Sequence, residues 1–248
     1  PYHCGPAALA TVLVDGGVTA TPEAQADTVF LPAREGSLQA EMLAGARRQG
    51  ALAWRLPGTL EAVFATVAAG QPVVVLQNLG LTVAPRWHYA VLVGYDLAQR
   101  TVVLRSGITR RELMPLATFE HTWARGGHWA FVALPPGRLP PVVDLDAALQ
   151  AAIAFERVAA PAAAARAYET LLARWPDPLL AWLGLGNARL AANDAAGAVT
   201  AYTEAARRHD SAVAWNNLAQ ALNRLGRRNE ALEAARRAVA RAESAEPV

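Results

Sequence analysis

The chain has 248 residues, of which 53% are hydrophobic and 18% are charged, and its formal net charge is +2 at pH 7. This length favours two domains, each large enough to bury a core of its own. The balanced charge excludes the strongly basic surface typical of nucleic-acid-binding proteins, and no run of about 20 apolar residues predicts a membrane span.

The single cysteine excludes an internal disulfide and a CxxC-type zinc site. None of the five histidines has the spacing of metal ligands, so we expect neither a metal nor a cofactor. Because the chain begins at Pro1 rather than Met, we expect that an upstream segment has been removed. A signal or anchor there would make the protein an exported one, periplasmic or lipid-anchored, but the sequence leaves the compartment open.

Three helices are predicted first. Residues 4–14 form an apolar, alanine-rich run with Pro6 in its first turn and Asp15 after its end, which predicts a buried helix that begins at Cys4. Residues 37–48 predict a helix with Ser37 as its N-cap, and residues 59–69 predict a third helix.

Short runs of β-branched and aromatic residues then predict strands at 72–76, 87–95, 101–104 and 129–134. Residues 96–100 are short enough to join two of these strands as a hairpin. Helices followed by strands indicate an α+β domain with an antiparallel sheet, which we expect to span residues 1–137.

Four prolines in residues 135–141 predict a stiff, extended linker, which we place at residues 138–143. Residues 144–248 then form an all-α domain with an internal repeat. Trp182 and Trp215 are 33 positions apart, and aligning them also matches Leu185 with Leu218. This pattern resembles the tetratricopeptide repeat, with two clear repeats and a degenerate leading one, and the resemblance implies a domain that binds a protein partner.

Cys4 and His88 are the residues with the clearest chemical potential. A helix N-terminus presents unpaired N–H groups and a positive dipole end, which favour a nucleophilic thiolate at Cys4. His88 opens a predicted strand and offers an imidazole that can exchange a proton with the thiol. The alternatives are a small buried cysteine and a structural histidine at a strand edge. We expect His3 to point elsewhere and His121 and His128 to lie around a loop.

The blocks YHCGPAALATVL, QPVVVLQN and WHYAVLVGYD, in this order, resemble the bacteriocin-processing (double-glycine) cysteine peptidases over roughly residues 1–135. The resemblance implies a papain-like fold in which Cys4 is the nucleophile and His88 is the general base. It also places a glutamine of the oxyanion hole a few residues before the cysteine, and that position would lie upstream of this sequence.

The same family places an aspartate on the strand after the histidine, where this chain has Ser106. The resemblance therefore makes Ser106 the candidate third member of the site, with a neutral hydroxyl in place of a carboxylate. Asp96 closes the strand of His88, on the order of 25 Å away along an extended chain. Gln77, Asn78 and Trp87 either line a substrate cleft or cap a loop.

The sequence thus predicts a cysteine peptidase that hydrolyses a peptide or protein substrate, with repeats that recruit a protein partner or the substrate. Two alternatives stay open. One is an acyl transferase similar to the phytochelatin synthases, which share a Cys-Gly pair on the leading helix and a later histidine. The other is a catalytically silent module in which both domains only bind proteins.

Overall fold

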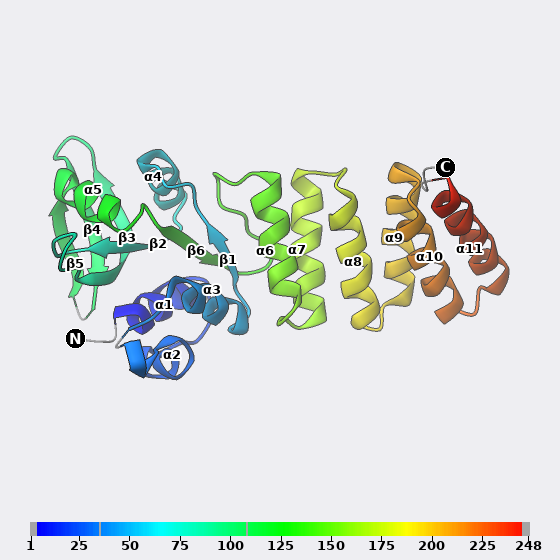
Figure 1. Cartoon of the computed structure of the whole chain (residues 1–248), viewed down its shortest axis with the longest axis horizontal. Helices are drawn as coiled ribbons and strands as arrows, with labels where there is room; N and C mark the ends of the chain where they lie inside the picture. The colour runs from blue at the N-terminus through cyan, green and yellow to red at the C-terminus, as the bar shows by residue number, and fades with distance from the viewer. Residues whose placement is uncertain (1–3, 35, 108, 245–248) are drawn as a thin grey trace. The chain divides into compact units, whose positions relative to one another are not determined.

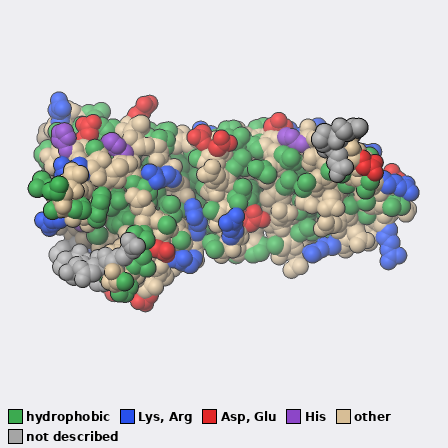
Figure 2. All heavy atoms as spheres, in the orientation of Figure 1, with side chains coloured by type: hydrophobic (Ala, Val, Ile, Leu, Met, Phe, Trp, Pro, Cys, Tyr) green, Lys and Arg blue, Asp and Glu red, His purple; other side chains and the backbone are tan. Residues whose placement is uncertain are grey.

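The computed structural model describes residues 4–34, 36–107 and 109–244 (Figure 1 and Figure 2). The chain divides into two compact units, with the boundary between Ala151 and Ala152. The helix α6 (Leu145–Glu156) spans this division. The domain ranges expected from the sequence, 1–137 and 144–248 with a linker between them, stay a prediction.

The first unit is built around a six-stranded sheet in which every pairing is antiparallel. The strands, in spatial order, are β1 (Leu52–Arg55), β6 (Ala130–Leu134), β2 (Val73–Asn78), β3 (Trp87–Asp96), β4 (Thr101–Ser106) and β5 (Thr109–Pro115). The helices of this unit are α1 (Cys4–Asp15), α2 (Pro22–Val29), α3 (Gln39–Arg48), α4 (Leu60–Ala68) and α5 (Leu116–Arg125). The predicted α+β fold with an antiparallel sheet is confirmed.

Successive side chains of β2 and β3 point to opposite faces of the sheet, and both faces are covered. Val74 and Val91 pair across these strands and pack in one core cluster with Leu9 of α1. Gln77, which points to the other face of β2, donates a hydrogen bond to Thr122 of α5. The apolar face of α1 therefore fixes the helix N-terminus, and with it Cys4, against the sheet that carries His88.

The second predicted helix begins later than expected. Its N-cap is Leu38, without a side-chain cap, so the prediction of Ser37 as N-cap is wrong. The Ser37 carbonyl instead accepts a hydrogen bond of 3.1 Å from the Tyr89 hydroxyl, which ties this loop to β3. Gly5 of α1 allows Ser37 to lie close to the start of this helix, since a Cβ on Gly5 would come within 2.4 Å of Ser37 Oγ.

The second unit consists of antiparallel helices that follow α6: α7 (Pro161–Arg174), α8 (Leu179–Ala191), α9 (Ala195–His209), α10 (Ala212–Arg224) and α11 (Arg228–Glu243). Gly184 receives the ring of Tyr168 and Gly186 receives the ring of Tyr202, so α8 packs closely on both of its neighbours. The all-α repeat domain expected from the sequence is confirmed.

Candidate active site

Cys4 is the first residue of α1, and its thiol is half-buried and free of any disulfide. It packs against the core cluster that contains Tyr89. Burial raises the pKa of the Tyr89 hydroxyl, and the nearby Cys4 adds to the increase, so the phenol stays neutral. The N–H groups in the first turn of a helix have no acceptor within the helix, so the start of α1 turns a positive dipole end toward Cys4.

His88 is the second residue of β3, and its imidazole is partly buried. Its Nε2 lies 2.8 Å from Ser106 Oγ of β4. The structure therefore brings these two predicted site residues together, and it leaves Nδ1 as the ring nitrogen that Ser106 does not engage. A single hydroxyl partner fixes the ring plane without adding a negative charge.

The His88 imidazole lies between opposing electrostatic influences. Burial lowers its pKa below the ordinary value of 6.5, Glu112 of β5 raises it and Arg86 lowers it. Asp96, the acid considered from the sequence, instead accepts a hydrogen bond from the Gln99 backbone in the β3–β4 turn. Glu112 was missed because β5 was not predicted.

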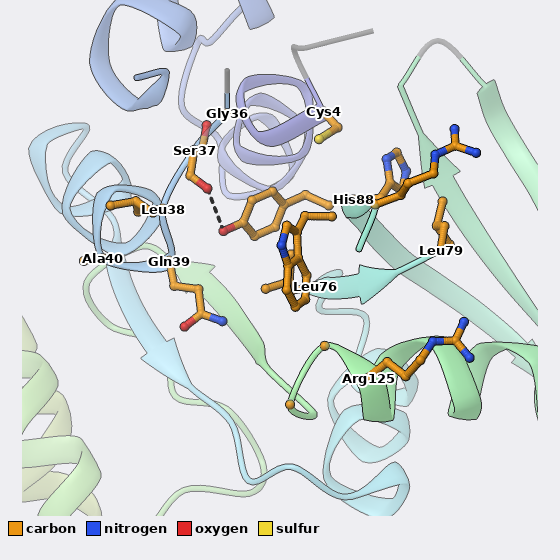
Figure 3. A pocket seen from close by; sticks show the side chains of 15 residues that line it. Cys4, Gly36, Ser37, Leu38, Gln39, Ala40, Leu76, Leu79, His88 and Arg125 are labelled. Carbon is orange, nitrogen blue, oxygen red and sulfur yellow. Dashed lines mark hydrogen bonds between the residues drawn. The ribbon is translucent and has the colours of Figure 1, made fainter. Parts of the chain in front are cut away.

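Cys4 and His88 line one pocket of about 1230 Å³. Figure 3 shows Cys4 at the start of α1 and His88 on β3 among the side chains that line this pocket, and its dashed line marks the hydrogen bond that the Ser37 carbonyl accepts from Tyr89. The remaining lining residues come from the loop before α3 and the first turn of α3, the ends of β2 and β3 with the loop between them, and the end of α5 with the turn that follows: Gly36, Ser37, Leu38, Gln39, Ala40, Leu76, Leu79, Arg86, Trp87, Tyr89, Arg125, Gly126 and Gly127. A cleft of this size accommodates several residues of an extended peptide.

Of the three residues considered for a substrate cleft, only Trp87 lines the pocket. Gln77 and Asn78 are 1% and 3% exposed and serve internal contacts. Gln77 donates to Thr122 Oγ1 at 2.7 Å, which joins β2 to α5. Asn78 Oδ1 accepts from the backbone N–H groups of Gly80 and Arg86, so it shapes the β2–β3 loop.

His3 lies outside the described residues. The other histidines lie away from Cys4 and His88. His121 lies in α5, shortly before the turn that carries His128, and the His128 ring packs edge-on against Trp123. In the described part of the chain, no three histidine, cysteine or acidic side chains gather as a metal site would require. None of the helices described there has the length and apolar character needed to cross a bilayer.

The sequence profile of the Peptidase_C39 like family matches residues 1–130, slightly more than half of the chain. The chain belongs to the Peptidase_C39 like family. The tetratricopeptide-repeat profile matches residues 149–213 and 183–246, so the C39-like domain is followed by tetratricopeptide repeats. Both resemblances noted in the sequence are thereby confirmed.

Solved structures similar to this C39-like chain include a C39-like peptidase from Bacillus anthracis, which is 20% identical. That alignment covers 54% of this chain and 88% of the other, with a TM-score of 0.43. Two MamA structures are 20% and 15% identical, cover 41% and 42% of this chain, and both have a TM-score of 0.39. This chain spans 60% of the length of each of those two. The comparison with curated proteins found no match.

The opposing charges around His88 predict how its titration responds to substitution. In a Cys4→Ser variant, which removes the thiol, the His88 ring should titrate below 6.5 because burial disfavours the imidazolium. Glu112→Gln should lower the midpoint further, and Arg86→Gln should raise it. NMR of the ring protons against pH measures all three values.

The same shift affects stability. Below about 6.5 the unfolded chain binds the proton more readily than the folded one, so His88 lowers the free energy of unfolding as the pH falls. A midpoint at or above 6.5 that neither substitution moves would contradict the assigned environment. Replacing the exposed Glu61 with glutamine is the control for loss of an acid elsewhere in this unit.

Proposed function

We propose that the C39-like domain is a cysteine peptidase in which Cys4 is the nucleophile, His88 the general base and Ser106 the residue that orients the imidazole. The observation that carries this proposal is the single pocket lined by both Cys4 and His88, with His88 Nε2 held 2.8 Å from Ser106 Oγ. Nucleophile, base and orienting group then come from α1, β3 and β4, three elements of one unit.

The proposed reaction has two steps. His88 takes the proton of Cys4, and the sulfur attacks the peptide carbonyl carbon to form a tetrahedral intermediate. The imidazolium gives its proton to the leaving amine as the C–N bond breaks, which leaves a thioester on Cys4. Water, deprotonated by His88, attacks the thioester; the C–S bond breaks, the thiol regains a proton and a carboxylic acid is released.

The unpaired N–H groups in the first turn of α1 support charge stabilisation in this mechanism. An oxyanion that forms at the carbonyl attacked by Cys4 lies next to those groups, and donors aimed at a developing charge contribute mainly in the transition state. Tyr89 does not compete for this role because its hydroxyl donates to the Ser37 carbonyl.

Trapping the thioester tests the reaction. Acid quenching during peptide turnover should give a mass adduct on Cys4, and reaction in H₂¹⁸O should place ¹⁸O in the new carboxyl group. An acyl transferase would form the same adduct but pass the acyl group to an added amine or thiol. If peptides bind and no Cys4 adduct forms, the domain is a binding module.

We further propose that the repeats hold a protein partner or the protein substrate. A groove of about 400 Å³ supports this role, and its lining residues come from α9, α10 and α11: Val199, Thr203, Trp215, Leu218, Leu222, Arg227, Asn229, Glu230, Glu233, Ala234 and Arg237. The Arg237 guanidinium lies over the Trp215 ring, 4.7 Å from its centroid, which places a cation and an aromatic face in the same groove. Stacked helical repeats commonly use such surfaces for extended ligands.

A larger side chain in this groove should weaken binding of the protein partner without changing the rate of peptide cleavage. Thr203 is exposed and lines the groove, so Thr203→Trp should lower retention of protein partners roughly tenfold by steric exclusion, with short-peptide cleavage unchanged. Thr200→Trp is the matched control, because Thr200 is exposed on the same helix outside the groove. The measurement is quantitative mass spectrometry of proteins that co-purify with a Cys4→Ala chain. Equal retention by both variants would place recruitment elsewhere.

A further inference from the structure

One buried residue at the end of β2 contacts two arginines that line the pocket. The Asn78 carbonyl accepts hydrogen bonds from Arg125 Nε and Nη2 at 3.2 and 3.0 Å. The Asn78 side-chain oxygen accepts from the Arg86 backbone N–H at 2.9 Å. Figure 3 draws Arg125 at the end of α5, with its guanidinium directed to the side of the pocket where Leu79 and His88 lie.

The loop that carries Arg86 is tightly closed. The Leu79 N–H donates to the Arg86 carbonyl, and the Asn78 side chain also accepts from Gly80. A Cβ on Gly80 would lie 2.3 Å from the Ala84 carbonyl oxygen, so only glycine fits there without a shift of the backbone. Arg86 therefore projects from a defined loop rather than from a long flexible one.

These two cations face the pocket without a carboxylate partner. Arg86 and Arg125 line the pocket, and no aspartate or glutamate is among its described lining residues. Within the described ranges, neither guanidinium forms an ion pair with an acidic side chain. Arg125 uses Nε and Nη2 for Asn78, which leaves Nη1 outside that contact.

The position of Arg86 also relates it to the chemistry. Its charge lowers the pKa of the His88 imidazole, so the guanidinium lies within electrostatic reach of the proposed base. Leu79, whose N–H donates to the Arg86 carbonyl, and the following residue Trp87 expose 42% and 57% of their surfaces while lining the same pocket. This end of the pocket thus combines two cations with apolar walls.

We propose that Arg86 binds a carboxylate of the substrate, with Arg125 adding positive charge to the same pocket, so that the C39-like domain selects peptides with an acidic group close to the scissile bond. This proposal rests on the proposed function and gives it a substrate class. A guanidinium matches the planar geometry of a carboxylate with paired N–H donors. The carboxylate comes either from an acidic side chain or from the free C-terminus of the peptide.

Alkylation of Cys4 tests the cationic site without requiring catalysis. The Cys4 sulfur attacks iodoacetate and iodoacetamide in the same way and displaces iodide from each, but only iodoacetate carries a carboxylate, so the ratio of the two rates reports the local positive charge. We expect Arg86→Gln to lower this ratio roughly fivefold, the size typical of one solvent-exposed charge contact. Arg125→Lys, which keeps the positive charge but loses the paired N–H donors of the guanidinium, should lower the ratio less.

Arg138→Gln is the matched control because Arg138 is exposed in the same unit and does not line the pocket. The rates are compared at a pH well above the titration of His88, where the ring is neutral in both chains, so that a change in their ratio reports the arginine. A ratio that is equal in the wild-type and Arg86→Gln chains would overturn the proposal. A thiol of ordinary reactivity also gives a measurable ratio of the two alkylation rates. An unactivated Cys4 would therefore count against the peptidase mechanism, while the ratio would still test the cationic site.

Peptide pairs then distinguish the two sources of the carboxylate. Affinities for the Cys4→Ala chain, measured by calorimetry, should be higher for glutamate peptides than for their glutamine isosteres if a side chain is bound. They should be higher for C-terminal acids than for C-terminal amides if the terminus is bound. Either preference should be lost in Arg86→Gln, and the absence of both preferences would refute carboxylate binding.

Discussion

Replacing Cys4 with serine is expected to lower the rate of peptide cleavage by roughly 10³-fold or more, because the proposed mechanism has no other nucleophile. Serine keeps roughly the size of the side chain but is a far weaker nucleophile. The His88 imidazole beside it is hydrogen-bonded to the Ser106 hydroxyl rather than to a carboxylate, so it is poorly suited to activate a serine. Cys4→Ala should lose the activity equally. The measurement is kcat/KM on a short peptide, together with the mass of any covalent adduct.

Two controls make this result interpretable. Cys4 is the only cysteine in the sequence, so labelling of the wild-type chain reports this site alone. Thermal unfolding of both variants should match that of the wild-type chain within about 1 kcal/mol, because one half-buried sulfur is exchanged for a smaller group. Cleavage that persists in Cys4→Ala would show that another residue carries the reaction.

The fold was predictable wherever the sequence had a strong hydrophobic pattern or clear turn residues. The apolar run after Cys4 and the turn at Asp96 gave α1 and the β3–β4 hairpin with bounds close to those observed. β5 was missed because it is a polar edge strand with two exposed arginines, whose pattern lacks a buried face. The missing strand also concealed Glu112, since its place near His88 exists only once the sheet is assembled.

The observed roles of Ser37 and Gln77 share a physical cause, whereas Asn78 follows the loop-contact alternative that the sequence left open. Each is a polar residue next to a predicted element, where local rules predict a helix cap or a loop contact. In the fold, the Ser37 carbonyl is bound by Tyr89, Gln77 binds Thr122 and Asn78 organises the β2–β3 loop. Partners 45 and 52 positions away decide these roles, and no local pattern contains them.

The placement of Ser106 had a different basis. The resemblance to cysteine peptidases supplied the position, and the antiparallel pairing of β3 with β4 supplies the contact. A β-bulge between Leu92 and Gly94 shifts the register along this pair, so counting residues along the strands does not fix which side chain meets His88. Its role as the third member of the site stays a prediction that only substitution can test.

His88→Ala is expected to lower both peptide cleavage and the alkylation rate of Cys4 at neutral pH by roughly 10²-fold or more, because no base then accepts the thiol proton. Alkylation with iodoacetamide separates this effect from substrate binding. His121→Ala is the matched control, since His121 is exposed on α5 and does not line the pocket. The control should retain both rates.

A series at Ser106 then tests whether its hydroxyl orients the imidazole. Ser106→Ala removes the 2.8 Å contact with His88 Nε2, and we expect a loss of roughly tenfold in kcat/KM with little change in KM, since orientation of the base matters mainly in the transition state. Ser106→Asp supplies a carboxylate that stabilises the imidazolium, so it should raise the pKa of His88 and restore or exceed the original rate. If Ser106→Ala and Ser106→Asp both matched the wild-type chain in rate and in the titration of His88, the hydroxyl would be a passive neighbour, and His88 would act on Cys4 without a third residue.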